Sequence, residues 1–279
     1  MVGGGLMGSG IAEVCARAGL DVIVREVTPE AAEAAQARIT KSLDRAVTAG
    51  KLTEGARDAA TATIRYTTDL GDFADRQLVV EAVVEDEQAK VDIFRQLDAV
   101  VTATGAILAS NTSSIPIMKL GTATSRPDHV IGVHFFNPVP VLRLVELVTS
   151  LMTSPATTRR CEEFATGVLN KRVIRSQDRA GFVVNALLIP YLLSAIRMME
   201  SGFATAEDID TGMVEGCSHP MGPLRLTDLI GLDTTQAVAE SLYAEFKEPL
   251  YAPPPLLSRM VEAGLLGRKS GRGFYDYAR

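Results

Sequence analysis

The sequence predicts an α/β fold in which a doubly wound, mostly parallel sheet is followed by a second, all-helical C-terminal domain. Three observations predict this class. A glycine-rich turn opens the chain, apolar strands then alternate with helical segments to about residue 178, and long apolar helical segments follow. Alternating strands and helices are typical of parallel sheets covered by helices. We expect the first domain to span residues 1–180 and the second to span residues 181–279.

The opening turn has the fingerprint of a dinucleotide-binding site. Gly3, Gly5 and Gly8 have the spacing GxGxxG and precede a helical pattern. In such Rossmann-like folds the first glycine makes a tight turn, the second lets a pyrophosphate approach, and the third allows close helix packing. The helix start, at Leu6 and Met7, offers unpaired N–H groups to phosphates. The alternative is an ordinary glycine-rich turn.

Glu26 strengthens the nucleotide interpretation. The strand DVIV follows the first helix and leads to Glu26, 18 residues after Gly8. An acid at this place accepts hydrogen bonds from the hydroxyls of an adenosine ribose.

The first strand of this pattern is nearly absent. Only Met1 and Val2 precede Gly3, where a full central strand is expected. Either the chain lacks its first few native residues, or the first strand is very short.

The other elements of the first domain follow in order. Residues 30–62 predict a projecting helical hairpin that breaks at Gly50 and carries Ser42, Arg45 and Lys51. The run LVVEAV is almost continuously apolar, as expected for a parallel strand covered on both faces. The expected strands lie at residues 64–67, 78–83, 106–110, 129–136 and 142–148, with a helix at 86–101.

The second domain is predicted from helical segments at residues 182–201, 206–216, 223–247 and 255–264. The most apolar stretch, residues 182–199, contains Asn185, Pro190, Ser194 and Arg197. A membrane span needs about 20 predominantly apolar residues. We therefore expect a buried helix and no membrane association.

Composition and charge exclude several classes of partner. The net charge of −6 gives no basic footprint for nucleic acid. Cys15, Cys161 and Cys217 are odd in number and far apart, and they have no Cys/His spacing of a metal site. No signal peptide precedes the glycines. We expect reduced thiols, no metal and a cytoplasmic location.

One histidine and one glutamate form the candidate catalytic pair. His134 ends the apolar strand VIGVHFF, and Glu146 is an isolated acid in LVELV, where a charge needs a partner. If the two strands fold back about Pro140, residues whose numbers sum to 280 pair, which brings His134 beside Glu146. The carboxylate would orient the imidazole as a general base. The alternative is a structural ion pair, while His129 and His219 are assigned to a strand edge and a turn.

Polar residues follow the predicted strand at 106–110. Asn111 and Ser113 belong to SNTSS, at the carboxyl end of a parallel strand, where ligands bind in open α/β sheets. They could face a nicotinamide or a substrate, or they could form a polar turn that caps a helix. Glu85 is open to the same two interpretations, and Asn185 in its apolar helix must find a polar partner.

The chain resembles the L-3-hydroxyacyl-CoA dehydrogenases over essentially its whole length. The stretches that carry the resemblance are GGGLMGSGIA, EAVVED, SNTSSI, HFFNPVPVLRLVELV, GFVVNALLIPYLLSAI, HPMGPLRLTDLIGLDT and GRKSGRGFYDY. The single-function bacterial 3-hydroxybutyryl-CoA dehydrogenases are the most similar branch. The resemblance implies a helical domain that forms a homodimer and an acyl-CoA substrate.

The resemblance also implies roles for individual residues. His134 matches the catalytic base and Glu146 its partner, while Ser113 and Asn185 match residues that hold the reacting oxygen and thioester region of the substrate. The implied cofactor contacts are Glu26, Glu85, Lys90, Asn137 and Lys269, and Ser42 matches a CoA contact.

Two further departures from the family concern ligands. Glu26 should repel a 2′-phosphate and favour NAD, but the preceding Arg25 could attract one, so NADP use stays open. Ala49 stands where the family has a basic CoA contact, and Lys51 or Arg45 could replace it.

The implied reaction transfers a hydride between C3 of a short-chain 3-hydroxyacyl-CoA and the nicotinamide, with His134 moving the proton. Two alternatives stay open at this point. The first is a dehydrogenase of a free hydroxy or sugar acid on the same scaffold. The second is a cofactor-binding protein without catalysis.

Overall fold

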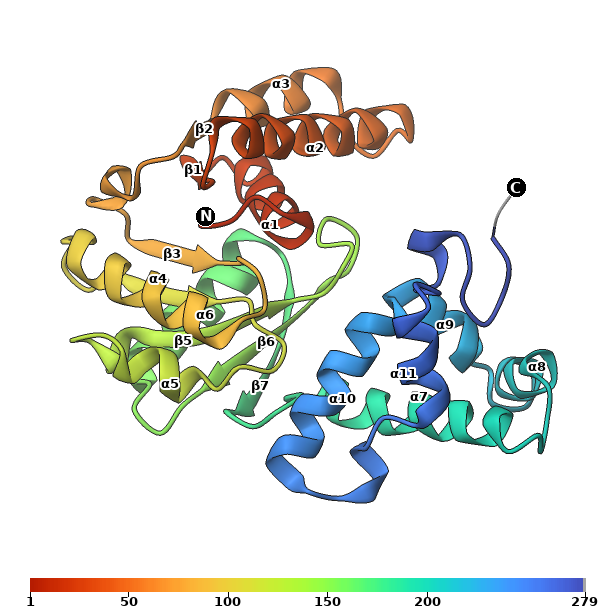
Figure 1. Ribbon diagram of the computed structural model, residues 1–279. Helices are drawn as coiled ribbons and strands as arrows, with labels where there is room; N and C mark the ends of the chain where they lie inside the picture. The colour runs from red at the N-terminus through yellow and green to blue at the C-terminus, as the bar shows by residue number, and fades with distance from the viewer. Residues whose placement is uncertain (278–279) are drawn as a thin grey trace. The chain divides into compact units, whose positions relative to one another are not determined.

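The computed structural model describes residues 1–277 and divides the chain into two compact units, Met1–Arg179 and Ala180–Arg279. The first unit is an α/β layer structure and the second is helical (Figure 1). The predicted fold class is therefore confirmed. Among residues 1–277, no helix is long and apolar enough to cross a membrane.

The sheet of the first unit is parallel except at one pair of strands. Its order is β3-β4-β5-β6-β7, and β1 and β2 form a separate parallel pair. Only β5 and β6 run antiparallel. The strands are β1 (Val22–Arg25), β2 (Ile64–Thr67), β3 (Leu78–Glu81), β4 (Ile107–Ser110), β5 (Val130–Phe135), β6 (Leu144–Thr149) and β7 (Arg172–Gln177).

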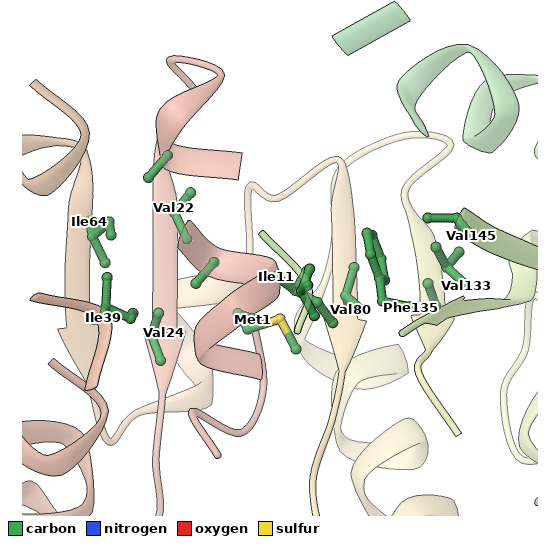
Figure 2. Close-up of a cluster of buried hydrophobic side chains, with 14 of the residues drawn as sticks. Met1, Ile11, Val22, Val24, Ile39, Ile64, Val80, Val133, Phe135 and Val145 are labelled. Carbon is green, nitrogen blue, oxygen red and sulfur yellow. The ribbon is translucent and has the colours of Figure 1, made fainter. Parts of the chain in front are cut away.

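Val2 takes the place of the first strand between β1 and β3. It forms isolated parallel bridges to Arg25 and to Glu81, and its N–H donates to the carbonyl oxygen of Val80 at 2.9 Å. Figure 2 shows Met1 and Ile11 between the strands that carry Val24 and Val80. Val2 alone thus bridges the two halves of the sheet, and a cavity of about 460 Å³ extends beside Met1 between them.

The helices of the first unit begin at the expected signals. Thr28 and Thr53 cap the two arms of the hairpin by accepting hydrogen bonds from backbone N–H groups, and Gly50 breaks the hairpin with a φ of +66°. The two helices lie within the range at which the hairpin is expected. The helices are α1 (Leu6–Arg17), α2 (Pro29–Thr48), α3 (Glu54–Ala62), α4 (Glu87–Val100), α5 (Ile117–Thr122) and α6 (Pro155–Glu163).

The pattern did not predict β7. Its residues, RVIRSQ, are all exposed or half-buried, and β7 pairs with β6 at the edge of the sheet. Two arginines in six residues hide the apolar period that identifies a strand. This strand matters for the site, because it covers the outer edge of the strand that carries Glu146.

The second unit consists of helices around its own apolar core. We expected one helix over residues 223–247, and this prediction is wrong: Gly231, with a φ of +103°, separates two helices. Asp210 and Asp228, which lie on two different helices, accept hydrogen bonds from the hydroxyls of Tyr275 and Tyr277 respectively. The helices are α7 (Val184–Glu200), α8 (Ala206–Cys217), α9 (Pro223–Ile230), α10 (Leu232–Phe246) and α11 (Pro255–Glu262).

Candidate active site

The glycine turn forms a cradle in which Gly3 and Gly8 leave no room for a side chain. A Cβ on Gly3 would lie 2.6 Å from the carbonyl oxygen of Ala82, and one on Gly8 would lie 1.9 Å from that of Gly3. Gly5 is exposed with nothing near its missing Cβ, and it precedes α1 without a side-chain cap. The first N–H groups of α1 therefore remain available to a pyrophosphate, and the cradle fits a dinucleotide.

Glu26 closes the cradle at the end of β1. Its Oε1 accepts a hydrogen bond of 2.6 Å from the N–H of Gly4, and Oε2 accepts one of 3.3 Å from the N–H of Val27. The neighbouring Arg25 donates from Nε to the carbonyl oxygen of Thr68 at 3.3 Å. The acid therefore lies against the glycine turn, while the arginine is engaged at the end of β2.

Two residues that the sequence analysis missed hold the turn from the other side. Ser9 donates from its hydroxyl to the carbonyl oxygen of Gly4 at 2.6 Å, and Arg38 of α2 donates to the same oxygen at 2.5 Å. Gly4 is thus held at its N–H by Glu26 and at its carbonyl by a cation. Arg38 lies on the hairpin that follows Glu26, but no spacing rule in the sequence pointed to it.

His134 and Glu146 face each other across the antiparallel strands. The register pairs the two residues, as the sum of 280 predicted, and His134 Nδ1 lies 2.7 Å from Glu146 Oε2. The exposed fractions of the two side chains are 7% and 0%. The ring of Phe136 lies 4.6 Å from the imidazole, centroid to centroid. The predicted pairing is confirmed, and its catalytic role stays a prediction.

A second buried charge cluster lies at the ends of β3 and β4. We call Lys90, Glu81 and Glu85 the Lys90 cluster. Lys90 Nζ lies 2.6 Å from Glu81 Oε1 and 3.2 Å from Glu85 Oε2. Glu81 also accepts a bond of 2.6 Å from the hydroxyl of Ser110. Its role was missed, although an acid inside LVVEAV is the same signal that singled out Glu146.

Glu85 organises the turn that carries Ser113. Its Oε1 accepts hydrogen bonds from the N–H of Ser113 at 2.9 Å and from the hydroxyls of Thr112 and Ser114. Burial alone would raise the pKa of Glu85, but the Lys90 charge and these hydrogen bonds outweigh it and lower the pKa. Asp86, not Glu85, caps α4, so the helix-cap interpretation is wrong. Glu85 fixes the turn, and its role toward a cofactor stays a prediction.

Asn111 links this turn to the strand of His134. It is only 8% exposed, and its Oδ1 accepts a hydrogen bond of 2.8 Å from the N–H of Phe135. The carbonyl half of the amide is therefore used by the protein. Its NH₂ group is the part that a nicotinamide or substrate would meet.

The remaining predicted residues are distributed over both units. Ser42 and Asn137 line a small hollow of about 80 Å³ formed by α1, α2 and the turn at residues 137–140. In the second unit, Asn185 is half-buried in the first turn of α7, and Lys269 pairs with Asp233 at 2.6 Å. The roles of Asn185 and Lys269 toward the ligands of the first unit stay predictions.

The other histidines have ordinary surroundings. His129 lies just before β5, 31% exposed and 3.6 Å from Asp128, and His219 lies 3.1 Å from the hydroxyl of Tyr191 in the loop after α8. Among residues 1–277, no group of three or more His, Cys, Asp or Glu side chains could hold a metal ion. The candidate chemistry is therefore concentrated at the carboxyl edge of the sheet.

A glycine cradle for a dinucleotide and a buried imidazole–carboxylate couple occur at one edge of the same sheet. Together they define a dinucleotide-dependent oxidoreductase. Residues 1–179 match the domain described as "3-hydroxyacyl-CoA dehydrogenase, NAD binding domain", and residues 181–277 match "3-hydroxyacyl-CoA dehydrogenase, C-terminal domain". The chain belongs to the 3-hydroxyacyl-CoA dehydrogenase family, and its cofactor is NAD.

Individual relatives are similar over nearly the whole chain. A 3-hydroxybutyryl-CoA dehydrogenase of Mycobacterium tuberculosis is 64% identical over 277 residues, which are 99% of this chain and 97% of the relative. The crystal structure of FadB2 from M. tuberculosis matches with a TM-score of 0.98 and 64% identity over 99% of this chain and 97% of that chain. The crystal structure of (S)-3-hydroxybutyryl-CoA dehydrogenase from Ralstonia eutropha matches with a TM-score of 0.94 and 46% identity, over 100% of this chain and 98% of that chain.

Proposed function

We propose that this enzyme interconverts 3-hydroxybutyryl-CoA and acetoacetyl-CoA with NAD and NADH. The observation that carries the proposal is the buried His134–Glu146 couple, with its nitrogen–oxygen distance of 2.7 Å. The similar bacterial enzymes named 3-hydroxybutyryl-CoA dehydrogenase support the choice of a four-carbon acyl group.

His134 is the proposed general base. Its Nδ1–H donates to the Glu146 carboxylate, so Nε2 is the atom that takes the proton of the 3-hydroxyl as C3 loses its hydride. Bound NAD supplies the hydride acceptor. Glu146 holds one orientation and one tautomer of the ring and stabilises the imidazolium that forms. In the reverse direction the imidazolium returns the proton to the oxygen at C3.

Ser113 and Asn185 are proposed to hold the substrate. The backbone N–H of Ser113 is held by Glu85, and the half-buried Ser113 lies just after the end of β4. A hydroxyl and an amide can both donate to the oxygen at C3 and to the thioester carbonyl. We assign Ser113 and Asn185 to these two oxygens.

The phosphates of CoA are proposed to lie along α2. Ser42 and Arg45 line the same hollow, one helical turn apart, whereas Ala49 at the end of α2 offers no charge. A guanidinium can bind a phosphate through two hydrogen bonds. Arg45 is therefore the proposed replacement for the basic residue that the family has at position 49.

NAD is proposed to bind in preference to NADP. The Glu26 carboxylate lies at the glycine turn and would face a 2′-phosphate with like charge, while Arg25 is bonded to the carbonyl oxygen of Thr68. Like charges brought together without a counterion are unfavourable. We expect NADPH to support a rate at least about tenfold lower than NADH, which corresponds to about 1.4 kcal/mol.

One spectrophotometric experiment tests the function. Initial rates of NADH oxidation are measured with acetoacetyl-CoA, with longer 3-oxoacyl-CoAs and with free acetoacetate, and are repeated with NADPH. We expect acetoacetyl-CoA with NADH to give the highest kcat/KM. A higher value with the free acid would favour the hydroxy-acid dehydrogenase, and NADH binding without any turnover would favour a protein without catalysis.

The second unit is proposed to form a homodimer. Large apolar side chains are exposed on it, among them Leu187 at 72% and Phe203 at 80%. Such side chains commonly mark protein interfaces when they are grouped. Light scattering should give twice the chain mass of 29.8 kDa, and a monomer mass would contradict this part of the proposal.

The three free cysteines fit the cytoplasmic location that we also propose.

A further inference from the structure

The turn between β5 and β6 connects the two strands that carry His134 and Glu146. His134 lies one residue before the end of β5, and Glu146 lies two residues after the start of β6. The intervening residues, 136–143, include Asn137, a proposed cofactor contact. Any shift of this turn would change the ends of both strands together. What holds the turn therefore bears directly on the chemistry.

Lys171 holds this turn from the side of β7. It immediately precedes β7, and its Nζ donates to the carbonyl oxygens of Val139 at 2.5 Å and of Leu142 at 2.7 Å. Only 9% of the residue is exposed. Two of the three ammonium protons are thus used by carbonyls of one turn, which fixes the distance between its two halves.

The charges around Lys171 are cationic. Lys171 shares a hollow of about 380 Å³ with Arg17 and Arg143, and none of the described residues that line this hollow is a carboxylate. Burial and the charge of Arg17 both lower the pKa of Lys171. Burying an ammonium without a carboxylate is costly unless it makes good hydrogen bonds. The two carbonyl contacts are therefore the interaction that keeps Lys171 in place.

The same turn is anchored to α1 on its other side. Val139 is 2% exposed, and a Cβ on Gly10 would lie 2.9 Å from the Cβ of Val139. Gly10 belongs to the helix that begins at the nucleotide cradle. The turn is thus fixed to the cradle by close packing and to β7 by the ammonium of Lys171.

We infer that Lys171 is a positioning residue of the proposed reaction. By holding Val139 and Leu142, it keeps Asn137 and the His134–Glu146 couple aligned with the nicotinamide. The inference rests on the proposed function. A misplacement of about 1 Å in the reacting groups can cost on the order of 10²-fold in rate. Loss of the two hydrogen bonds from Lys171 should therefore slow hydride transfer more than it weakens substrate binding.

The test compares Lys171→Met with Arg143→Met. The second variant is a control, because it removes a charge from the same hollow and keeps the hydrogen bonds from Lys171 to Val139 and Leu142. We expect Lys171→Met to lower kcat by about 10- to 100-fold, with a smaller change in KM for acetoacetyl-CoA. The primary isotope effect on kcat, measured with NADH deuterated at the transferred position, should rise because hydride transfer becomes more rate-limiting. Arg143→Met should leave kcat and the isotope effect close to those of the wild type.

Lys171→Arg keeps two donors and a positive charge, so we expect it to recover part of the lost rate. It also replaces the Met variant if that variant does not fold, with an intermediate kcat and isotope effect as the expected result. A lower unfolding midpoint with wild-type kcat and isotope effect would assign Lys171 a structural role only and overturn the inference. Inactivity of the wild type toward acetoacetyl-CoA would instead overturn the proposed function, and the inference with it.

Discussion

The His134–Glu146 couple and the Lys90–Glu81 pair are two buried pairs of titratable side chains at the same edge of one sheet, yet their chemistry differs. Their exposed fractions are similar, 7% and 0% for His134 and Glu146 against 1% and 0% for Lys90 and Glu81. An imidazole exchanges a proton near neutral pH, whereas the ammonium of a lysine acts as a compact fixed charge. Burial alone therefore does not distinguish the two groups, and the difference to test is whether the imidazole moves a proton.

The hydrogen-bond partners of the carboxylates also differ between the two groups. Glu81 and Glu85 accept bonds from hydroxyls and backbone N–H groups of the segments at residues 83 and 110–114, so their lone pairs serve the local structure. Glu146 lies on β6, between β5 and β7, and its Oε2 is 2.7 Å from Nδ1 of the His134 imidazole. We expect the first group to act as scaffold and the second to move a proton.

His134→Gln should produce the largest effect on rate. The glutamine amide can still donate to Glu146, so folding should be preserved while the general base is lost. We expect kcat to fall by about 10²–10⁴-fold, with the NADH dissociation constant and the unfolding midpoint little changed. Steady-state rates, NADH fluorescence titration and thermal unfolding measure these three quantities.

His129→Gln is the matched control, because His129 also pairs with an acid but is 31% exposed. It should retain the wild-type rate. If His134→Gln kept the wild-type kcat, or if His129→Gln lost activity equally, the distinction between the two buried groups would fail.

Lys90→Met should have the largest effect on stability. The change leaves Glu81 buried without its cation, and breaking a buried pair in this way costs about 3–5 kcal/mol. Urea unfolding at pH 7 measures the loss. Lys119→Met is the control: Lys119 and Glu87 are also 2.6 Å apart, but their exposed fractions are 52% and 49%.

An exposed pair of this kind contributes about 0–1 kcal/mol. Equal losses of stability in the two lysine variants would show that burial does not strengthen the Lys90 cluster. A fall in kcat of the Lys90 variant as large as that of His134→Gln, at a temperature where it is folded, would remove the division between scaffold and catalysis.

The sequence predicted what depends on local patterns and missed what depends on distant neighbours. The glycine spacing and the fold-back of two apolar strands were enough to place Gly3, Gly8, His134 and Glu146, because register follows from chain geometry. Lys171 was missed because its partners lie 29 or more residues away and are backbone carbonyls, which leave no mark on sequence.

The predicted boundaries of the elements were wrong where a single residue ends a helix. The helical pattern continues through residues 223–247, but the positive φ of Gly231 ends one helix and starts another. The strand β7 was not predicted, because its two arginines interrupt the apolar pattern that identifies a strand. Both errors are errors of local pattern, and neither displaced a predicted site residue from its element.

Glu85→Gln should give the smallest effect and distinguishes the two carboxylates of the Lys90 cluster. The pKa of Glu85 is lowered in the folded protein, so its contribution to stability is fully present above the ordinary glutamate value of 4.5 and is lost as the pH falls through the lower folded value. Because the side chain is 40% exposed, solvent screens the interaction, and we expect a loss of at most about 1 kcal/mol at pH 7. The difference in unfolding midpoint between the wild type and this variant should therefore shrink as the pH is lowered from 6 to about 3.

Glu87→Gln is the control, because it removes an exposed acid from the first turn of α4, and it should give a smaller difference at pH 7. A difference for Glu85→Gln that stays constant over this range would mean that the amide disturbs the hydrogen bonds to Thr112 and Ser113, and that the charge of Glu85 contributes nothing to the scaffold.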